Sequence, residues 1–290
     1  MVNKKLGIAY NIFDGEELLP FSLLCVRDVA HYIVVVYQIT SNYGKRNKEL
    51  VPLLKTLEQI GLIDELVYYE PSLKIVDENG NDVDNIGSLN EQMKRNIGLE
   101  KCIENECGVF SSMDADEMYV FEDYNKALNI FIEGNYDSSF CQMETYYKLA
   151  DMKVVPPETY YVPLFYNVMG KRSSLKFSFT GNYNLLCDGT RQIKAGYPKI
   201  FSRDEIQMHH YSYVRNDISS KVYNSSAQMP ESEKEKVIEY FNSWRVGNKG
   251  YFIGKQIFNL AKTENLFNIK FNEYTNKIEL PKFVANSNKR

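Results

Sequence analysis

The segment Met113-Asp114-Ala115-Asp116-Glu117 places three carboxylates within four residues, at the end of a strand-like segment that contains the hydrophobic residues Val109, Phe110 and Met113. Hard divalent cations such as Mg²⁺ and Mn²⁺ prefer carboxylate oxygens and substrate phosphates as ligands. Carboxylates held this close repel one another unless a cation relieves the repulsion. A solvated acidic turn would have the same composition. Because these carboxylates follow a hydrophobic, strand-like segment, we predict a metal site that stabilises a phosphate leaving group.

Polar side chains also follow two earlier strand-like segments. Asn11 follows the first of them, and Gln38, Ser41 and Asn42 follow the second. In open α/β sheets, ligands bind beyond the carboxyl ends of the strands. Amide and hydroxyl groups at such ends can pair with both the donors and the acceptors of a ligand, although Asn and Ser also serve in turns. These positions are candidates for a ligand site.

The elements that must position these side chains alternate between strand-like and helix-like segments. This alternation predicts an α/β fold in which helices flank a central, mostly parallel sheet. The hydrophobic patterns predict strands at residues 6–10, 32–37, 66–69 and 108–113, and helices at residues 16–29, 47–60 and 91–106. The polar residues 77–90 predict a surface loop.

The pattern loosens beyond a predicted helix at residues 123–134. Strands predicted at 138–147 and 161–168, in a stretch that contains several prolines, indicate a mixed or antiparallel region. A further helix is predicted at residues 233–244, after a polar break. Residues 226–290 are therefore interpreted as a C-terminal helical extension.

Five stretches, in order along residues 6–220, resemble the glycosyltransferase family 2 type, whose members have the A-type (GT-A) nucleotide-binding fold and a DxD motif. The stretches are Tyr10-Asn11-Ile12-Phe13-Asp14-Gly15-Glu16, Tyr37-Gln38-Ile39-Thr40-Ser41-Asn42-Tyr43-Gly44, Lys94-Arg95-Asn96-Ile97-Gly98, Met113-Asp114-Ala115-Asp116-Glu117 and His209-His210-Tyr211-Ser212-Tyr213-Val214-Arg215. The resemblance implies a Rossmann-like GT-A domain over residues 1–225, with a donor nucleotide-binding half at 1–120 and an acceptor-side half at 121–225. It also implies transfer of a hexosyl or related group from a nucleoside-diphosphate sugar.

The resemblance assigns roles to the acidic segment and to one histidine. Asp114 would contact the ribose, and Asp116 and His210 would hold Mn²⁺ or Mg²⁺ beside the diphosphate, so Asp116 is a catalytic candidate as well as a metal ligand. His209 and His210 are adjacent in an extended segment and should face opposite sides. We prefer His210 because it directly precedes the rest of the matching stretch. A pair of ordinary structural imidazoles is the alternative.

The resemblance also places the nucleobase and ribose at the four polar positions that follow the first two strands. Arg95 and Asn96 resemble residues that contact the nucleotide, whereas Lys94 is interpreted as part of a solvated basic turn. Arg215 and Lys221 follow the histidine segment, where they could clamp the diphosphate or begin a solvated helix.

The acceptor half contains the candidates for a general base, which an inverting enzyme needs near the acceptor hydroxyl. Glu144, Glu158 and Asp188 are polar positions in this half. We select Glu144 as the catalytic candidate because its strand-like segment would face the acceptor. A retaining enzyme would need none of these residues as a base.

Composition limits the alternatives. The formal net charge of −4 provides no basic field for a polyanion, so nucleic acid is disfavoured as a partner, although a modified base in DNA remains a conceivable acceptor. The five cysteines are widely spaced and match no zinc motif, and no apolar run reaches the length of a transmembrane helix. We therefore expect a cytoplasmic protein with reduced cysteines and no transmembrane segment.

The sequence thus favours a metal-dependent glycosyltransferase. Its partners would be a nucleotide-sugar donor and a hydroxyl acceptor on a glycan, a lipid-linked saccharide or another glycoconjugate. A nucleotidyltransferase of related fold and a non-catalytic carbohydrate-binding protein are the alternative hypotheses. No GxGxxG, GxxxxGK[ST] or GxSxG motif occurs in the chain, so the usual dinucleotide, P-loop and hydrolase signatures are missing.

Overall fold

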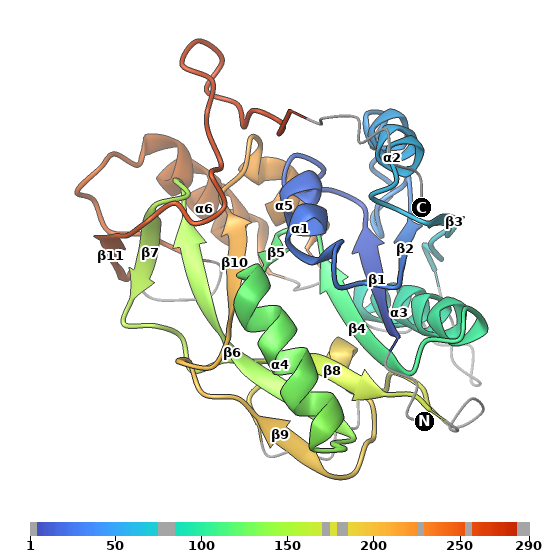
Figure 1. Ribbon diagram of the computed structural model, residues 1–290. Coiled ribbons are helices and arrows are strands. Elements are labelled where there is room, and N and C mark those ends of the chain that lie inside the picture. The colour runs from blue at the N-terminus through green and yellow to red at the C-terminus, as the bar shows by residue number, and fades with distance from the viewer. Residues whose placement is uncertain are drawn as a thin grey trace.

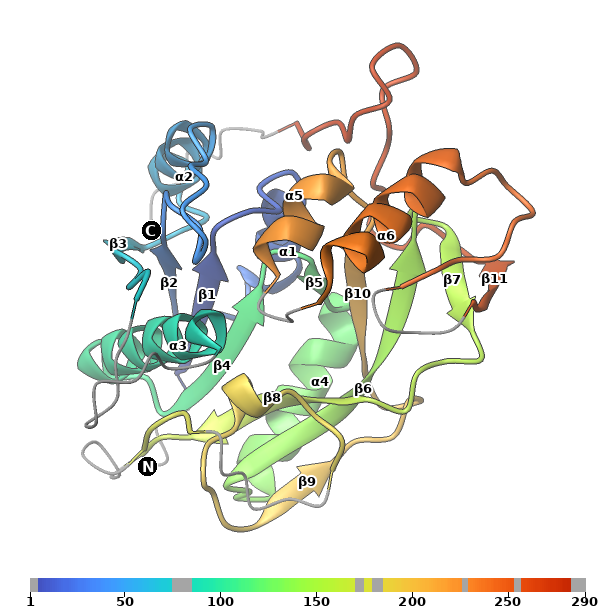
Figure 2. The same ribbon diagram turned by 180° about the vertical axis from the view of Figure 1, so that it is seen from behind.

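The computed structural model describes residues 5–74, 85–169, 175–178, 185–225, 229–252 and 257–282. In this part of the chain a central sheet carries helices on both faces (Figures 1 and 2). The α/β class predicted from the alternating segments is confirmed. None of the helices in these ranges has the length and hydrophobicity needed to cross a bilayer.

The first half of the chain supplies the parallel part of the sheet. Its strands are β1 (Leu6–Ile12), β2 (Tyr32–Tyr37), β3 (Glu65–Tyr68) and β4 (Val109–Asp114). Their order is β3-β2-β1-β4, so the chain moves outward from β1 to β3 and then returns to the other side of β1. This reversal is a topological switch point, where open α/β sheets bind their ligands. The register places Asn11 opposite Asp114 at that point.

Helices pack on the two faces through alternate side chains of the strands. The helices of the first half are α1 (Leu19–Val26), α2 (Leu50–Gln59), α3 (Ile86–Glu104) and α4 (Phe121–Glu133). Ile8 and Tyr10 of β1 belong to the core formed with α1, α2 and α4, whereas Ala9 belongs to the core formed with α3. Gly98 of α3 approaches β1 so closely that a Cβ there would lie 2.4 Å from the Ala9 Cβ. This close packing fixes α3 against the switch point.

The part of the sheet that follows the acidic segment is mixed, as predicted. Its elements are β5 (Glu117–Met118), β6 (Ser138–Tyr147), β7 (Met152–Val155), β8 (Tyr161–Asn167), the 3₁₀ helix η1 (Gly189–Arg191), β9 (Pro198–Ile200) and β10 (Gln207–Tyr213). Strand β8 pairs antiparallel with both β4 and β6. Strand β10 runs parallel to β6 and antiparallel to β5, which brings the histidine segment beside the acidic segment.

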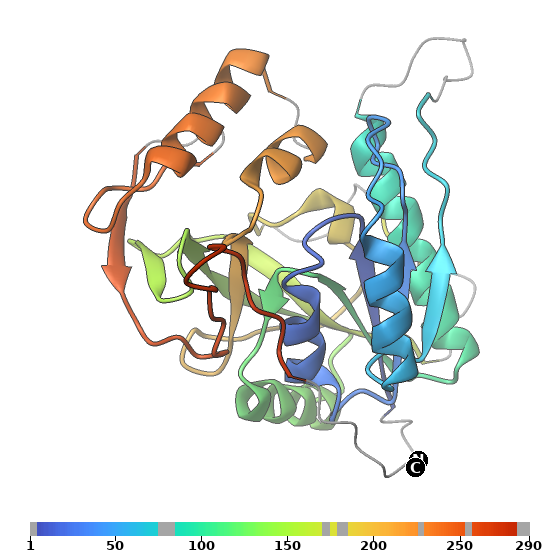
Figure 3. The same cartoon turned by 90° about the horizontal axis from the view of Figure 1, so that it is seen from above.

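The C-terminal part contains α5 (Ile218–Asn224), α6 (Glu231–Ser243) and β11 (Asn259–Lys262). Figure 3 shows α5 and α6 on the side of the sheet opposite α1 and α4. Strand β11 pairs antiparallel with β7 and extends the sheet order to β11-β7-β6-β8-β4. Residues after 225 therefore add an edge strand to the sheet in addition to the predicted helix.

Helix α3 begins earlier than predicted, at Ile86, and this corrects part of the predicted loop at residues 77–90. The Asn90 side chain explains the difference, because its Oδ1 accepts hydrogen bonds from the Tyr69 hydroxyl at 2.7 Å and from the Ser72 N–H at 3.1 Å. These tertiary contacts stabilise a helical turn that has no side-chain cap. Residues 77–84 of the predicted loop lie outside the described ranges.

Candidate active site

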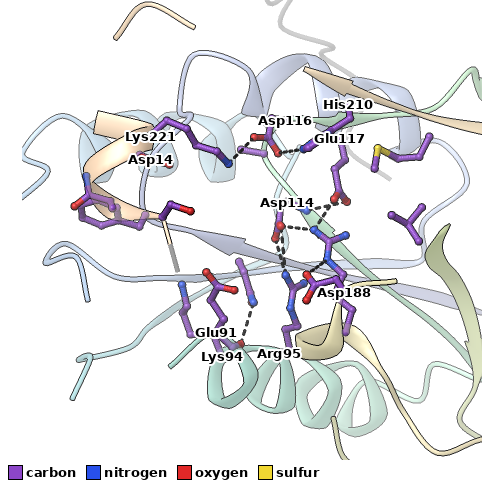
Figure 4. A pocket seen from close by; sticks show the side chains of 18 of the residues that line it. Asp14, Glu91, Lys94, Arg95, Asp114, Asp116, Glu117, Asp188, His210 and Lys221 are labelled. Carbon is purple, nitrogen blue, oxygen red and sulfur yellow. Dashed lines mark hydrogen bonds and ion pairs between the residues drawn. The ribbon is translucent and has the colours of Figure 1, made fainter. Parts of the chain in front are cut away.

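A cavity of about 300 Å³ lies at the switch point between β1 and β4 (Figure 4). We term it the polar cavity. Its lining residues are Asn11, Phe13, Asp14, Gln38, Asn42, Glu91, Lys94, Arg95, Asp114, Ala115, Asp116, Glu117, Met143, Tyr160, Val162, Asp188, Arg191, Met208, His210, Arg215, Lys221, Asn224 and Ser225. The acidic segment and most of the candidate nucleoside residues therefore face one space.

Asp114 is held between two arginines. Arg95 Nη2 lies 3.2 Å from Asp114 Oδ1 and 3.3 Å from Oδ2, and Arg191 forms a close ion pair with Oδ2. Arg95 is itself oriented by a 2.7 Å hydrogen bond to Ser112 Oγ. Burial alone would raise the pKa of Asp114, but Arg191 and Arg95 outweigh it, and this pKa lies below its usual value. Asp114 is thus ionised and fixed in orientation at neutral pH.

Glu117 and Asp188 complete the same ionic network. Arg191 Nη2 lies 2.5 Å from Glu117 Oε1, and Arg191 Nε lies 3.3 Å from Asp188 Oδ2. Burial raises the pKa of Glu117 to about 7, and Arg191 opposes this rise. Three carboxylates therefore share the Arg191 guanidinium, and a substitution of Arg191 would leave buried negative charge uncompensated.

Asp116 is the centre of a second cluster. Its Oδ2 lies 2.6 Å from Arg215 Nη2 and 3.5 Å from Lys221 Nζ, and its Oδ1 lies 3.8 Å from His210 Nε2. Burial opposes ionisation of Asp116, but Lys221 and Arg215 outweigh it and lower its pKa far below the usual range. Burial also lowers the pKa of His210 to about 4. A neutral imidazole therefore faces an ionised carboxylate at neutral pH.

The loop after β1 positions Arg215 at this cluster. Arg215 Nη1 lies 3.3 Å from Asp14 Oδ1. The next residue, Gly15, has a φ of +80°, and a Cβ at this position would lie 2.8 Å from Arg215 Nη1. Glycine is therefore needed here both for the backbone conformation and for the space that the guanidinium occupies.

Strand β10 directs its two histidines to opposite sides, as predicted. His210 lines the polar cavity, and its Nδ1 has no hydrogen-bond partner in the described part of the chain. His209 is buried beside Tyr146, whose hydroxyl lies 2.9 Å from His209 Nδ1. Of the two histidines, His210 is the one that lies beside the acidic segment. Its role as a metal ligand stays a prediction.

Asn11, Gln38 and Asn42 line the polar cavity at the ends of β1 and β2. Gln38 Nε2 donates to Thr40 O at 2.9 Å and to Asn42 Oδ1 at 3.3 Å, and Asn11 Nδ2 donates to Glu91 O at 3.2 Å. Asn11 Oδ1 and Gln38 Oε1 are buried and accept no hydrogen bond from the described residues. Buried polar atoms are nearly always paired in native proteins. These two oxygens are therefore suited to donors on a ligand.

Lys94 is buried in the wall of the polar cavity, with 4% of its surface exposed. The interpretation of Lys94 as part of a solvated turn is therefore wrong. The structural reason is the close packing of α3 on β1, which turns Lys94 and Arg95 inward together. Burial lowers the pKa of Lys94 to about 8, and its ammonium forms no hydrogen bond or ion pair with other described residues.

Two of the predicted nucleotide contacts do not line the polar cavity. Ser41 Oγ accepts hydrogen bonds from the N–H groups of Tyr43 at 3.2 Å and Lys45 at 3.0 Å, so it stabilises the turn after β2. Asn96 Oδ1 accepts a 2.8 Å hydrogen bond from the Phe177 N–H. In these contacts both side chains support the backbone around the cavity, and a direct contact with the nucleotide stays a prediction.

Glu144 also lies outside the polar cavity, which corrects the expectation that it faces the acceptor. Its neighbour Met143 lines the cavity, and alternate residues of a strand face opposite sides. Glu144 instead pairs with Lys153 Nζ at 3.2 Å and lies opposite His209 in the β6–β10 register. A general base must therefore be sought elsewhere among the residues of the cavity wall.

Asp116 and His210 are the residues best placed to hold a cation. Their facing atoms, Oδ1 and Nε2, are 3.8 Å apart, a separation that one bound divalent ion can span. Among the described residues, no group of three or more His, Cys, Asp or Glu side chains is arranged to hold a metal ion. The residues therefore fit a cation that takes its remaining ligands from phosphate oxygens and water.

Arg191 is a site residue that the sequence analysis did not identify. It lies 77 residues after Asp114 in the chain, at the end of η1. The only local sequence feature near Arg191 is the cap of this turn, where Asp188 Oδ1 accepts a hydrogen bond from the Thr190 N–H at 2.8 Å. That pattern is common to many turns and does not predict a contact with the acidic segment.

Comparisons with known proteins give structural likeness only. No protein-family model matches the chain, and no curated protein matches it significantly. The crystal structure of S. aureus TarS 1-349 is 12% identical, with coverage of 81% of this chain and 69% of that chain and a TM-score of 0.45. Its complex with UDP-GlcNAc is 11% identical, with coverage of 82% and 71% and a TM-score of 0.46. The chain covers 43% of the longer S. aureus TarS structure, at 12% identity and a TM-score of 0.44.

Proposed function

We propose that this protein is a glycosyltransferase that moves a sugar from a nucleoside-diphosphate sugar to an acceptor hydroxyl. The observation that carries the proposal is the composition of the polar cavity at the switch point. Asn11 and Gln38, each with an unpaired buried side-chain oxygen, line it at the ends of β1 and β2, and Arg215 and Lys221 supply positive charge around Asp116. A nucleoside offers donors for the first group, and a diphosphate suits the second.

Asp114 is assigned to the ribose of the donor. It lines the cavity next to Asn11, and two arginines keep it ionised. An ionised carboxylate accepts hydrogen bonds and donates none, so it suits a pair of ribose hydroxyls. Arg95 and Arg191 fix the carboxylate before the donor arrives, which reduces the ordering required on binding.

The diphosphate is assigned to the cluster around Asp116. Arg215 and Lys221 would stabilise the negative charge that develops on the leaving diphosphate. Asp116 and His210 would hold Mn²⁺ or Mg²⁺ at the same place, and such a cation supplies further neutralisation of this charge when bound. The expected metal dependence follows from this pair of residues.

Asp188 is the candidate general base for an inverting transfer. Its side chain is 32% exposed and lines the polar cavity, whereas Glu144 does not line it. In the transfer, the acceptor oxygen forms a bond to the anomeric carbon while its proton passes to the Asp188 carboxylate. The bond between the anomeric carbon and the diphosphate oxygen breaks, and the electron pair leaves with the diphosphate.

The donor site is tested by calorimetric titration of the full chain with UDP and GDP, with and without MnCl₂. Asp116→Asn should lower the affinity for the preferred nucleotide and reduce sugar transfer at least about 100-fold. Asp204→Asn is the matched control, because Asp204 is exposed and does not line the cavity. Full activity of Asp116→Asn with metal present would refute the proposal.

The competing functions give different results in the same assays. A nucleotidyltransferase would release pyrophosphate from a nucleoside triphosphate, and a non-catalytic carbohydrate-binding protein would bind no nucleoside diphosphate.

The variant Asp188→Asn tests the general base separately from nucleotide binding. It should abolish turnover with a panel of nucleotide sugars and leave nucleotide affinity within about two-fold of wild type. Normal turnover of this variant would exclude Asp188 as the base.

A further inference from the structure

A second cavity, of about 680 Å³, adjoins the polar cavity, and we term it the apolar cavity. Most of its lining side chains are aliphatic or aromatic, among them Val154, Pro156, Leu186, Phe252, Ile257 and Phe258. Glu158, Thr159 and the Tyr160 hydroxyl are the polar exceptions.

The two cavities share a wall. Tyr160 lines both of them. Leu186 lines the apolar cavity, and Asp188, two residues later, lines the polar cavity. Two residues of extended chain span at most about 7 Å. The Tyr161 N–H also donates to Leu186 O at 2.9 Å, which joins the two segments of this shared wall. The apolar cavity therefore lies within about two residues of chain from Asp188, close enough for one ligand to contact both.

The C-terminal extension forms the far wall of the apolar cavity. Phe252 and Phe258 pack with their ring centroids 4.2 Å apart, and Phe252 also packs against Tyr213 and Tyr147 at 4.4 and 5.8 Å. This aromatic cluster ties the wall to β6 and β10. Leu186 and Ile257 form the open rim and remain 67% and 54% exposed. Exposed apolar side chains around a preformed cavity are typical of a ligand site.

We propose that the apolar cavity binds the hydrophobic tail of an amphipathic acceptor, whose hydroxyl-bearing head lies at Asp188. The inference rests on the proposed function and names the class of its acceptor: an alkyl or prenyl glycoside or alcohol. A free sugar would bury its hydroxyls against this mostly apolar lining without partners, which is unfavourable. An alkyl tail gains about four-fold in affinity for each methylene that it buries. The lining therefore selects a tail over a second sugar ring.

The test uses calorimetric titration of the UDP-saturated chain with methyl, hexyl and octyl β-D-glucopyranoside below their micelle concentrations. Affinity should rise at least about ten-fold from the hexyl to the octyl glucoside. Leu186→Asp and Ile257→Asp should each weaken octyl glucoside binding about ten-fold or more, while UDP affinity stays unchanged. Both residues are exposed, so these variants should fold. Val246→Asp is the matched control, because Val246 is 73% exposed and lines neither cavity.

Equal affinity for methyl and octyl glucoside would overturn the inference, and so would wild-type octyl glucoside binding by both rim variants. A loss of octyl glucoside binding in Val246→Asp would show a non-specific surface effect and would also overturn it. Failure of the proposed function has a different signature. In that case neither UDP nor GDP binds the wild-type chain, whatever happens with the glucosides.

Discussion

Lys94→Met should stabilise the protein and weaken nucleotide binding at the same time. Burial lowers the pKa of Lys94 from 10.5 to about 8, and each pKa unit corresponds to about 1.4 kcal/mol of preference for the neutral form. Holding the charged ammonium in the folded protein therefore costs up to roughly 3 kcal/mol. Because Met has a similar length and no charge, we expect the unfolding free energy to rise by about 1–3 kcal/mol at pH 7.

The pH dependence of the unfolding free energy tests whether the charge of Lys94 causes the difference in stability. The folded pKa is lower than the unfolded one, so the unfolded chain binds more protons between about pH 8 and pH 10.5. The cost of burying the charged Lys94 ammonium is fully present below pH 8 and disappears as the pH rises through this window. Wild-type stability should therefore rise relative to that of Lys94→Met from pH 8 upward. Urea denaturation at pH 7, 8 and 9.5 measures this difference.

Nucleotide affinity provides the second test of the role of Lys94. If Lys94 serves the donor, Lys94→Met should bind UDP or GDP about ten-fold more weakly than wild type. Lys101→Met is the matched control on the same helix, because Lys101 is paired with Glu65 and Glu104 and does not line the cavity. A less stable Lys94→Met variant with unchanged nucleotide affinity would refute the reasoning and leave Lys94 a structural role.

Three further outcomes follow from the packing. Gly15→Ala forces a Cβ against Arg215 at a φ of +80° and should weaken diphosphate binding, measured by calorimetry, with a stability loss of about 1 kcal/mol. Gly98→Ala should destabilise the chain by about 1–3 kcal/mol in urea denaturation, because its Cβ would overlap Ala9. Burial lowers the pKa of His209 to about 4, so the unfolded chain binds more protons below pH 6.5 and stability should fall from pH 6.5 to pH 4. His209→Gln should remove up to about 3 kcal/mol of that fall.

The first half of the chain could be predicted well from the sequence because its signals are local. The run from Tyr32 to Tyr37 is rich in β-branched residues, and the observed β2 has the predicted bounds. The acidic segment follows a hydrophobic strand, and the strand order then requires it to face the loop after β1. The opposite orientation of His209 and His210 also followed from the two-residue period of a strand.

The positions of Glu144, Arg191 and Lys94 were harder to predict because they depend on contacts between distant segments. The alternation around Glu144 defines two faces of a strand, but nothing in that segment identifies which face looks into the cavity. Arg191 reaches the acidic segment through a short turn with no distinctive motif. Lys94 looked solvated because a lysine usually is, and its burial depends on how closely Gly98 allows α3 to approach β1.

The structure also shows how the negative charge of Asp114, Asp116 and Glu117 is compensated. Arginine and lysine side chains from distant segments supply much of the compensation: Asp114 Oδ2 pairs with Arg191, and Asp116 Oδ2 pairs with Arg215 and Lys221. Asp116 Oδ1 instead faces the neutral imidazole of His210. The spacing of the acidic residues therefore does not by itself require a metal ion. The case for a metal depends on Asp116 Oδ1 and His210 Nε2, which can share a cation only together with phosphate oxygens. A metal bound there should accordingly bind more tightly in the presence of the nucleoside diphosphate than alone, and the diphosphate should gain the same factor from the metal.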